Sequence, residues 1–262
     1  MVSIYSRGID LLQLTLFLGK GEELTHDSRY ASRACKSEKV LAVLHDFLGV
    51  DLSAYTCLDV GCSQGGITHQ ITPHFRWTIG IDPDQGAIRG AVRSSHSENI
   101  GFAIASGYLL PFPDHSFDVV ICAQVYEHVI DQPGLAREIC RVLRPGAICF
   151  FSGPNRLAFM EEHYWLPLLS WPPRSLSNLY MRIFQRGNYY DAYPLFYWQI
   201  RNLWGSFLIN DYTLILIHEP HRFATGWRLG KFAWVSRLPT RLLKVFTPLF
   251  PNYNWILVKP TE

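Results

Sequence analysis

The stretch from Leu58 to Gly66 constrains the fold of this chain more than any other segment. An apolar run at 55–60 contains Asp59 near its end and then breaks into small residues and glycines. Helix-forming residues follow at 67–71. This pattern is typical of a strand that stops at a tight turn and opens a helix, which is where an open α/β sheet binds a nucleotide. We therefore predict an α/β fold with a nucleotide-type ligand at this turn.

The position of Asp59, just before the first glycine, indicates which nucleotide the turn suits. A dinucleotide pyrophosphate is anionic and binds bare backbone N–H groups at a helix N-terminus, so a carboxylate at the strand end would repel it. S-adenosylmethionine has no phosphate and carries a sulfonium and an ammonium group, from which Asp59 can accept hydrogen bonds. Gly61, Ser63 and Gly65 would let the backbone pass close beneath this ligand, where larger side chains would collide.

Two other interpretations of the turn remain open. Gly61, Ser63 and Gly66 nearly match a dinucleotide fingerprint, which would suit a nicotinamide-dependent oxidoreductase. Asp59 and the lack of a Tyr-x-x-x-Lys pair disfavour that reading. The turn could also be an ordinary connection between a strand and a helix, without a ligand.

The rest of the chain alternates short apolar strands with helices, which favours a parallel, doubly wound sheet in a single domain spanning 1–262. Helices are expected at 37–48, 84–95 and 133–143, and strands at 76–81, 100–105, 117–123 and 147–152. The alternation covers a core at 37–155. A segment at 156–206, rich in Trp, Tyr, Pro and Arg, follows and is expected to form a substrate lid, with a helical subdomain of ordinary core aromatics as the equal alternative. The C-terminal part, 207–262, is expected to hold strands at 212–218 and 254–259 around a basic, aromatic segment at 227–250.

A second acid, Asp82, lies 21 positions after Gly61, at the end of the second predicted strand. An acid at this point can bridge the two ribose hydroxyls of an adenine nucleoside. Because Asp before Pro is also common in turns, a purely structural role is the alternative.

Four segments carry a resemblance to a known family: LDVGCSQG at 58–65, IGID at 79–82, LPFPDHSFDVV at 110–120 and LRPG at 143–146. With this order and spacing, the chain resembles the class I S-adenosylmethionine-dependent methyltransferases, and in particular the ubiquinone and menaquinone methylases. The resemblance implies a Rossmann-like, doubly wound sheet of seven strands. Its last strand would be antiparallel and inserted near the edge, and here a helical aromatic insertion would follow strand five.

The resemblance also implies the cofactor-binding residues. Asp59, Gly61, Ser63 and Gly65 would hold the methionine end of S-adenosylmethionine, and Asp82 the ribose. Family members often have an Asp next to the adenine amino group, where this chain has Ser106, so adenine is expected to rest more on Gly107, on Tyr108 and on stacking. Gln124, at the end of the fourth predicted strand, would lie near the cofactor methyl group.

His128 is the candidate catalytic residue, as a general base on a substrate hydroxyl, because its ordinary pKa lies near neutrality. A structural role at a helix start is the alternative. Some relatives carry Glu-x-x-Glu-His here and bind a divalent metal. Gln124 replaces the first carboxylate in this chain, leaving Glu127 and His128, so no metal site is expected.

Composition limits the partners. The formal charge is +2 and no Lys/Arg run stands out, so nucleic acid binding is not expected. Six cysteines without a C-x-x-C pair favour free thiols in a cytoplasmic protein. The apolar segment at 9–18 contains Asp10 and Gln13, which favours an amphipathic helix over a signal core. The basic, aromatic segment at 227–250 allows peripheral membrane contact.

These observations predict a methyltransferase that uses S-adenosylmethionine to methylate a small hydrophobic or glycolipid-like acceptor, most readily at oxygen. The aromatic share of 14%, with tryptophans concentrated after residue 160, favours an apolar or ring-bearing substrate. The alternative from another class is an inactive scaffold with the same fold that docks to a membrane or a partner. The sequence does not indicate an oligomeric state.

Overall fold

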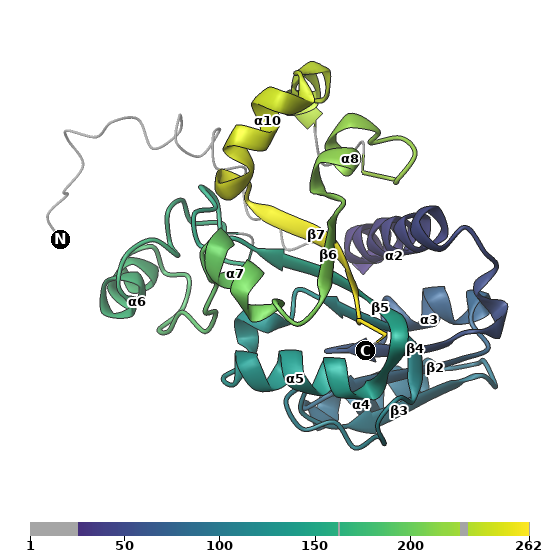
Figure 1. Cartoon of the computed structure of the whole chain (residues 1–262). Helices are drawn as coiled ribbons and strands as arrows, with labels where there is room; N and C mark the ends of the chain where they lie inside the picture. Colours follow the sequence, from purple (N-terminus) through teal and green to yellow (C-terminus); the bar gives the residue numbers. More distant parts are fainter. Residues whose placement is uncertain (1–25, 162, 226–229, 262) are drawn as a thin grey trace, which may run out of the picture.

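The computed structural model describes residues 26–161, 163–225 and 230–261. Its centre is a seven-stranded sheet in the order β3-β2-β1-β4-β5-β7-β6 (Figure 1). The strands are β1 (Thr56–Val60), β2 (Trp77–Asp82), β3 (Ile100–Ile104), β4 (Phe117–Ala123), β5 (Leu143–Pro154), β6 (Leu208–Asp211) and β7 (Asn252–Val258). β7 runs antiparallel to both β5 and β6, between which it is inserted. The predicted doubly wound sheet with an antiparallel last strand is confirmed.

Helices cover both faces of the sheet (Figure 1). They are α2 (His26–Leu48), α3 (Thr68–Ile71), α4 (Gln85–Arg93), α5 (Gln132–Val142), α6 (Arg174–Ile183), α7 (Tyr197–Leu203), α8 (Thr213–His218) and α10 (Thr240–Phe246). One core joins the sheet to α5 and α7, and another joins its opposite face to α2, α3 and α8.

β4 shows why the sequences of the central strands are continuous apolar runs. Val120 and Cys122 belong to the core on the α5 side, whereas Val119 and Ile121 belong to the core on the α2 side. All four are fully buried. A parallel strand covered on both faces needs apolar side chains at consecutive positions, because successive side chains point to opposite faces.

Within the segment at 156–206, the part that contains α6 has its own small core of Leu166, Leu169, Met181, Tyr190 and Ala192, whereas α7 packs into the core that joins α5 to the sheet. Figure 1 shows α6 lying to one side of the sheet. This predicted aromatic insertion after strand five is confirmed. The buried Tyr126 anchors it, since its hydroxyl donates to the Pro154 carbonyl and accepts from the Leu195 N–H at 3.1 Å.

The predicted strand at 212–218 is wrong, because these residues form α8. The actual strand, β6, lies directly before it. The alternation of Leu and Ile around 214–217 resembles a strand, but burial follows a helical period: Tyr212 and Leu216 are both buried while Ile215 is exposed. The segment predicted at 9–18, and residues 226–229 of the basic segment, lie outside the described residues.

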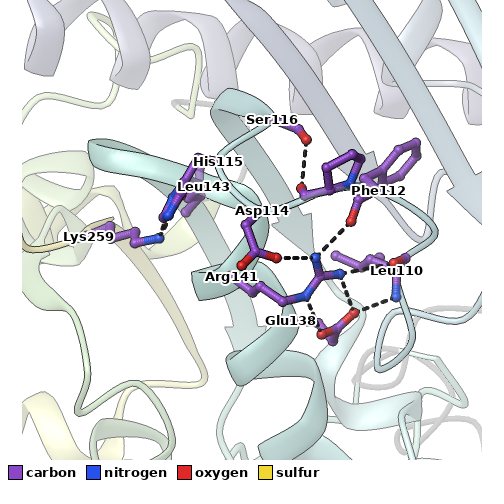
Figure 2. A network of polar contacts seen from close by, with 10 residues as sticks. Leu110, Phe112, Asp114, His115, Ser116, Glu138, Arg141, Leu143 and Lys259 are labelled. Atoms are coloured by element: carbon purple, nitrogen blue, oxygen red, sulfur yellow. Dashed lines mark hydrogen bonds and ion pairs between the residues drawn. The ribbon is translucent and has the colours of Figure 1, made fainter.

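A polar network fixes the loop that connects β3 to β4 (Figure 2). The Arg141 guanidinium on α5 donates to both carboxylate oxygens of Glu138, to Asp114 at 2.8 Å and to the carbonyls of Leu110 and Phe112. Glu138 also accepts the N–H of Leu110 at 2.7 Å. These bonds hold the LPFPD motif against α5 and thereby set the path of the chain after Ser106.

The six cysteines are free thiols, four of them buried. Among the described helices, none has the length and apolar character needed to cross a membrane.

Candidate functional site

The turn after β1 has the backbone that its glycines predict. Gly61, Ser63 and Gly65 all have positive φ angles, of 71°, 50° and 76°. A Cβ on Gly61 would lie 2.5 Å from a methyl group of Val125, so this position needs glycine for space as well as for conformation. The Cys62 N–H donates to the Ile81 carbonyl at 2.9 Å, which ties the turn to the end of β2.

Asp59 is buried beneath this turn. Its Oδ2 accepts a hydrogen bond from the Thr68 hydroxyl of α3 at 2.6 Å. Burial raises the pKa of Asp59 to about 7, and the nearby Asp82 also raises it, against the Thr68 hydrogen bond. A buried carboxyl in this state is poised to bind a cation, because a neighbouring ammonium group would favour its ionised form.

Asp82 lies at the carboxyl end of β2, beside the turn. One carboxylate oxygen accepts the Ser63 N–H at 2.9 Å, and the other accepts the Asp84 N–H at 2.9 Å. These bonds fix the carboxylate at the strand end while each oxygen keeps a second lone pair. The side chain is therefore held in place to accept further hydrogen bonds, as from a ribose.

Ser106 and Gly107 follow β3 at the same edge of the sheet. Ser106 pairs with Leu109 in an isolated antiparallel bridge that reverses the chain. A Cβ on Gly107 would lie 2.8 Å from Leu135 and 3.2 Å from Val60, so a glycine lets this loop approach the end of β1. The structure thus brings these predicted residues to the edge where Asp59 and Asp82 lie.

Gln124 directly follows β4, with a φ of 60°. Its amide lies 3.4 Å from the Ser152 hydroxyl and 3.3 Å from the side chain of Asn252, so it joins the ends of β4, β5 and β7. The positive φ turns the chain sharply into the 3₁₀ turn η3 (Tyr126–His128), which carries the candidate base.

His128 is exposed at the end of η3, and its Nε2 lies 3.3 Å from Nε2 of His163 in the insertion. Desolvation, followed by the neighbouring His163, lowers the pKa of His128. Sequence reasoning missed this pairing. The two histidines are 35 residues apart, and no spacing pattern joins a residue after β4 to one in the insertion. Glu127, fully buried, lies in the same cluster.

The carboxyl edges of β1, β2, β3 and β4 thus present two fixed acids, a glycine turn and a histidine. A separate cavity of about 500 Å³ opens at the opposite, amino edge, where Thr56, Trp77 and Phe117 begin their strands. In open α/β sheets, ligands bind outside the carboxyl ends of the strands, which assigns the candidate site to the first group.

Residues 58–151 match the model of a family described as a methyltransferase domain. Over those residues the chain is similar to methyltransferase domains. A probable S-adenosylmethionine-dependent methyltransferase of Mycolicibacterium smegmatis is 39% identical over 104 residues, which are 39% of each chain. A ubiquinone biosynthesis O-methyltransferase of Methylobacterium nodulans is 29% identical over 137 residues, covering 48% of this chain and 53% of that protein.

The crystal structure of the Bacillus subtilis protein YcgJ has the same fold, with a TM-score of 0.54 over 86% of this chain and 98% of that one, at 16% identity. The matched segments cover only 39% and 53% of the lengths of the Mycolicibacterium smegmatis and Methylobacterium nodulans relatives.

The site fits S-adenosylmethionine, the methyl donor named for the Mycolicibacterium smegmatis relative. A Cβ at Gly65 would lie 2.8 Å from the His69 ring and 3.1 Å from Phe102. The glycine therefore lets the turn pack closely against α3 and β3. The donor set fits as well, because buried Asp59 suits a cationic amino acid group and Asp82 suits a pair of hydroxyls.

Proposed function

We propose that this protein is a methyltransferase that transfers the methyl group of S-adenosylmethionine to a small, hydrophobic or lipid-like acceptor, at an oxygen atom. The observation that carries the proposal is the pair of fixed acids around the glycine turn: a buried Asp59 whose pKa is about 7 and an Asp82 held by two backbone N–H groups. This pairing complements a ligand with an ammonium group and a ribose.

In this proposal the cofactor supplies an activated methyl group, and the protein supplies alignment. Holding a nucleophile and the methyl group in line contributes most of the rate acceleration in such a transfer. Asp59, Gly61, Ser63 and Gly65 hold the amino acid part, and Asp82 holds the ribose. Ser106 and Gly107 border the adenine, and Gln124 shapes the turn toward the acceptor side. His128 as general base stays a prediction.

The aromatic insertion supports an apolar acceptor with a polar or anionic head. The Arg174 guanidinium lies 4.0 Å from the centre of the Tyr193 ring, and Arg156 lies 5.0 Å from that of Phe196. The backbone of Tyr193 donates to the Glu127 carbonyl at 2.6 Å, so this surface adjoins η3 at the carboxyl edge. The aromatic side chains could pack against a ring or an acyl chain of the acceptor. The arginines stacked on them could pair with an anionic group at its end.

The first experiment measures the binding of S-adenosylhomocysteine and of NADH by calorimetry. We expect micromolar binding of S-adenosylhomocysteine, no binding of NADH, and at least about a tenfold loss of affinity in Asp59→Ala, since a charge-assisted hydrogen bond is worth about 1.5–3 kcal/mol. Asp51→Ala, an exposed acid before β1, is the control. NADH binding without S-adenosylhomocysteine binding would replace the proposal with the oxidoreductase alternative.

The acceptor is sought by incubating the protein with S-adenosylmethionine labelled in the methyl group and with lipid and phenol extracts. Label that moves into an organic-soluble product, is stable to mild base and is released as methyl iodide by hydriodic acid, as from methyl ethers, supports O-methylation of a hydroxyl. Label that is lost on mild base treatment indicates a methyl ester instead. Absence of turnover by a protein that binds the cofactor supports the inactive scaffold.

Exposed apolar side chains on two helices favour contact with an anionic membrane as a second property of the same protein. On α6, Leu176, Leu179 and Ile183 are 54%, 47% and 65% exposed and share one face by their spacing. On α10, Leu242, Val245 and Phe246 are likewise exposed. Neither 163–190 nor 220–261 contains an Asp or Glu, although both contain several Arg or Lys residues. Apolar faces bordered by basic residues bind anionic lipid surfaces.

Sedimentation with vesicles tests this contact. We expect binding to phosphatidylglycerol-containing vesicles, weak binding to pure phosphatidylcholine, and about a tenfold loss in the double variant Ile183→Glu/Val245→Glu. Val92→Glu is the control, because Val92 is 54% exposed on α4, outside both helices. Equal binding of the double variant and this control would contradict the assignment of α6 and α10.

A further inference from the structure

Three side chains with metal-binding atoms converge where the insertion meets the end of β4. They are Glu127 and His128 of η3 and His163 of the insertion, and their ligand atoms all lie within 4.8 Å of one another. Two neutral imidazoles and one carboxylate are the protein ligands of several catalytic zinc sites. The set is assembled only by the fold, because His163 lies 35 residues after His128.

The spacing of the two imidazoles matches a shared ion. Nε2 of His128 and Nε2 of His163 lie 3.3 Å apart. Two nitrogens bound to one tetrahedral zinc ion at about 2.0–2.1 Å lie about 3.3 Å from each other. The rings are nearly perpendicular, at 87°, as two ligands that approach one point from different elements can be. The geometry therefore presents both nitrogens to the same small volume.

A second set of contacts orients His163 for this role. Its Nδ1 lies 2.8 Å from Oε1 of Glu161, so the proton is held on that side and Nε2 is left as the acceptor. The Glu161 carboxylate is itself fixed, because its Oε2 accepts the backbone N–H groups of His163 and Tyr164 at 2.8 and 2.7 Å. A buried carboxylate behind a ligating histidine is the usual outer partner of a zinc ligand.

We propose that Glu127, His128 and His163 form a binding site for a divalent transition metal, with Zn²⁺ as the best match to the ligand set. Three protein ligands leave a fourth position open, as in catalytic rather than structural zinc sites. Building on the function proposed above, that position suits an acceptor oxygen, whose proton the ion would make more acidic. With the ion bound, Nε2 of His128 would be a ligand and therefore could not act as the general base.

Metal titration tests the site without using the methyl transfer reaction. Chelator-treated protein is titrated with Zn²⁺ by calorimetry and with Co²⁺ by visible absorption, which reports the coordination geometry. We expect one ion per chain with a tetrahedral Co²⁺ spectrum. His163→Ala should lose this spectrum and bind Zn²⁺ at least about 100-fold more weakly. Glu161→Gln, which keeps the acceptor oxygen but removes the charge, should weaken binding by about 10–100-fold.

His221→Ala is the matched control, because His221 is an exposed histidine that lies outside the cluster. Wild-type affinity in His163→Ala, or no stoichiometric binding by the wild type, would overturn the proposal and leave a histidine pair that joins the insertion to η3. S-adenosylhomocysteine binding, measured on the same samples, distinguishes the two failures. A protein that binds this ligand but no metal keeps the proposed function and loses the metal site.

Discussion

Gly61 combines a left-handed backbone with a lack of space for any side chain. Its φ is 71°, and an added Cβ would overlap Val125 at 2.5 Å. Gly61→Ala should therefore lower the free energy of unfolding by about 2–4 kcal/mol, of which the backbone conformation accounts for about 1 kcal/mol. Urea unfolding monitored by circular dichroism measures the loss.

Gly49→Ala separates the two contributions. Gly49 has a similar φ of 63° but no atom within 4 Å of the added Cβ, so this variant should lose only the conformational part. Val125→Ala in the Gly61→Ala background should recover some of the stability. If Gly61→Ala and Gly49→Ala cost the same, the contact with Val125 does not constrain the turn.

Asp59 links cofactor binding to pH. Its folded-state pKa of about 7 lies above its ordinary value of 3.8, so the folded protein without ligand holds a proton that the unfolded chain has released. The free energy of unfolding should fall as pH rises from about 4 to 7. Affinity for S-adenosylhomocysteine should increase about tenfold from pH 6 to pH 8, because the ionised form binds the ammonium group.

Calorimetry in buffers with different ionisation enthalpies measures both the affinity and the proton released on binding. Asp59→Asn has no titrating carboxyl at this position, so its affinity and its stability should both vary less with pH. A wild-type affinity that is constant between pH 6 and pH 8 would show that Asp59 is already ionised in the free protein.

At the scale of elements, α8 shows how burial, rather than residue type, decides between helix and strand. Leu216→Ala should cost about 2–4 kcal/mol, because Leu216 is 5% exposed in the core between α2 and the sheet. Leu214→Ala should cost less than about 1.5 kcal/mol, since Leu214 is only partly buried. In a strand the two side chains would share a face. Equal losses in denaturant unfolding would therefore favour the strand.

At the scale of the whole molecule, β7 joins the C-terminal segment to β5 and to α7 of the insertion. Trp255 is fully buried, pairs with Phe151 of β5, and its ring contacts Phe151, Tyr253 and Tyr197. Trp255→Ala should lower the free energy of unfolding by about 3–5 kcal/mol. It should do so in a single transition, because the affected core includes α5, α7 and the sheet.

Trp255→Phe is the informative companion. It keeps a ring in the cluster and removes an indole N–H that has no hydrogen-bond partner within the described part of the chain. Both variants remove this donor, so the ring that Phe keeps should make Trp255→Phe more stable than Trp255→Ala by about 2 kcal/mol. Equal destabilisation by both variants would mean that a single ring at this position does not replace the packing contacts of the larger indole.

The sequence predicted the strands from β1 to β5 with little error because their signals are local. Each signal lies within a few residues of the turn or core position that it specifies. This holds for the strand before Gly61, for the acids Asp59 and Asp82, and for the buried residues of β4. The strand prediction at 212–218 failed because strand-like residues there follow a helical burial period. The period becomes visible only when the neighbouring α2 is in place.

The sequence by itself determined the sheet, its turn and the identity of the methyl donor, because these depend on short-range patterns of charge, glycine and hydrophobicity. The tertiary structure alone decided which residues meet across long separations. It brought His163 to 3.3 Å from His128 and fixed Glu161 behind it, where the sequence offered two metal ligands instead of three. The packing of the insertion against η3 through Tyr126 creates that contact, and no local pattern encodes such packing.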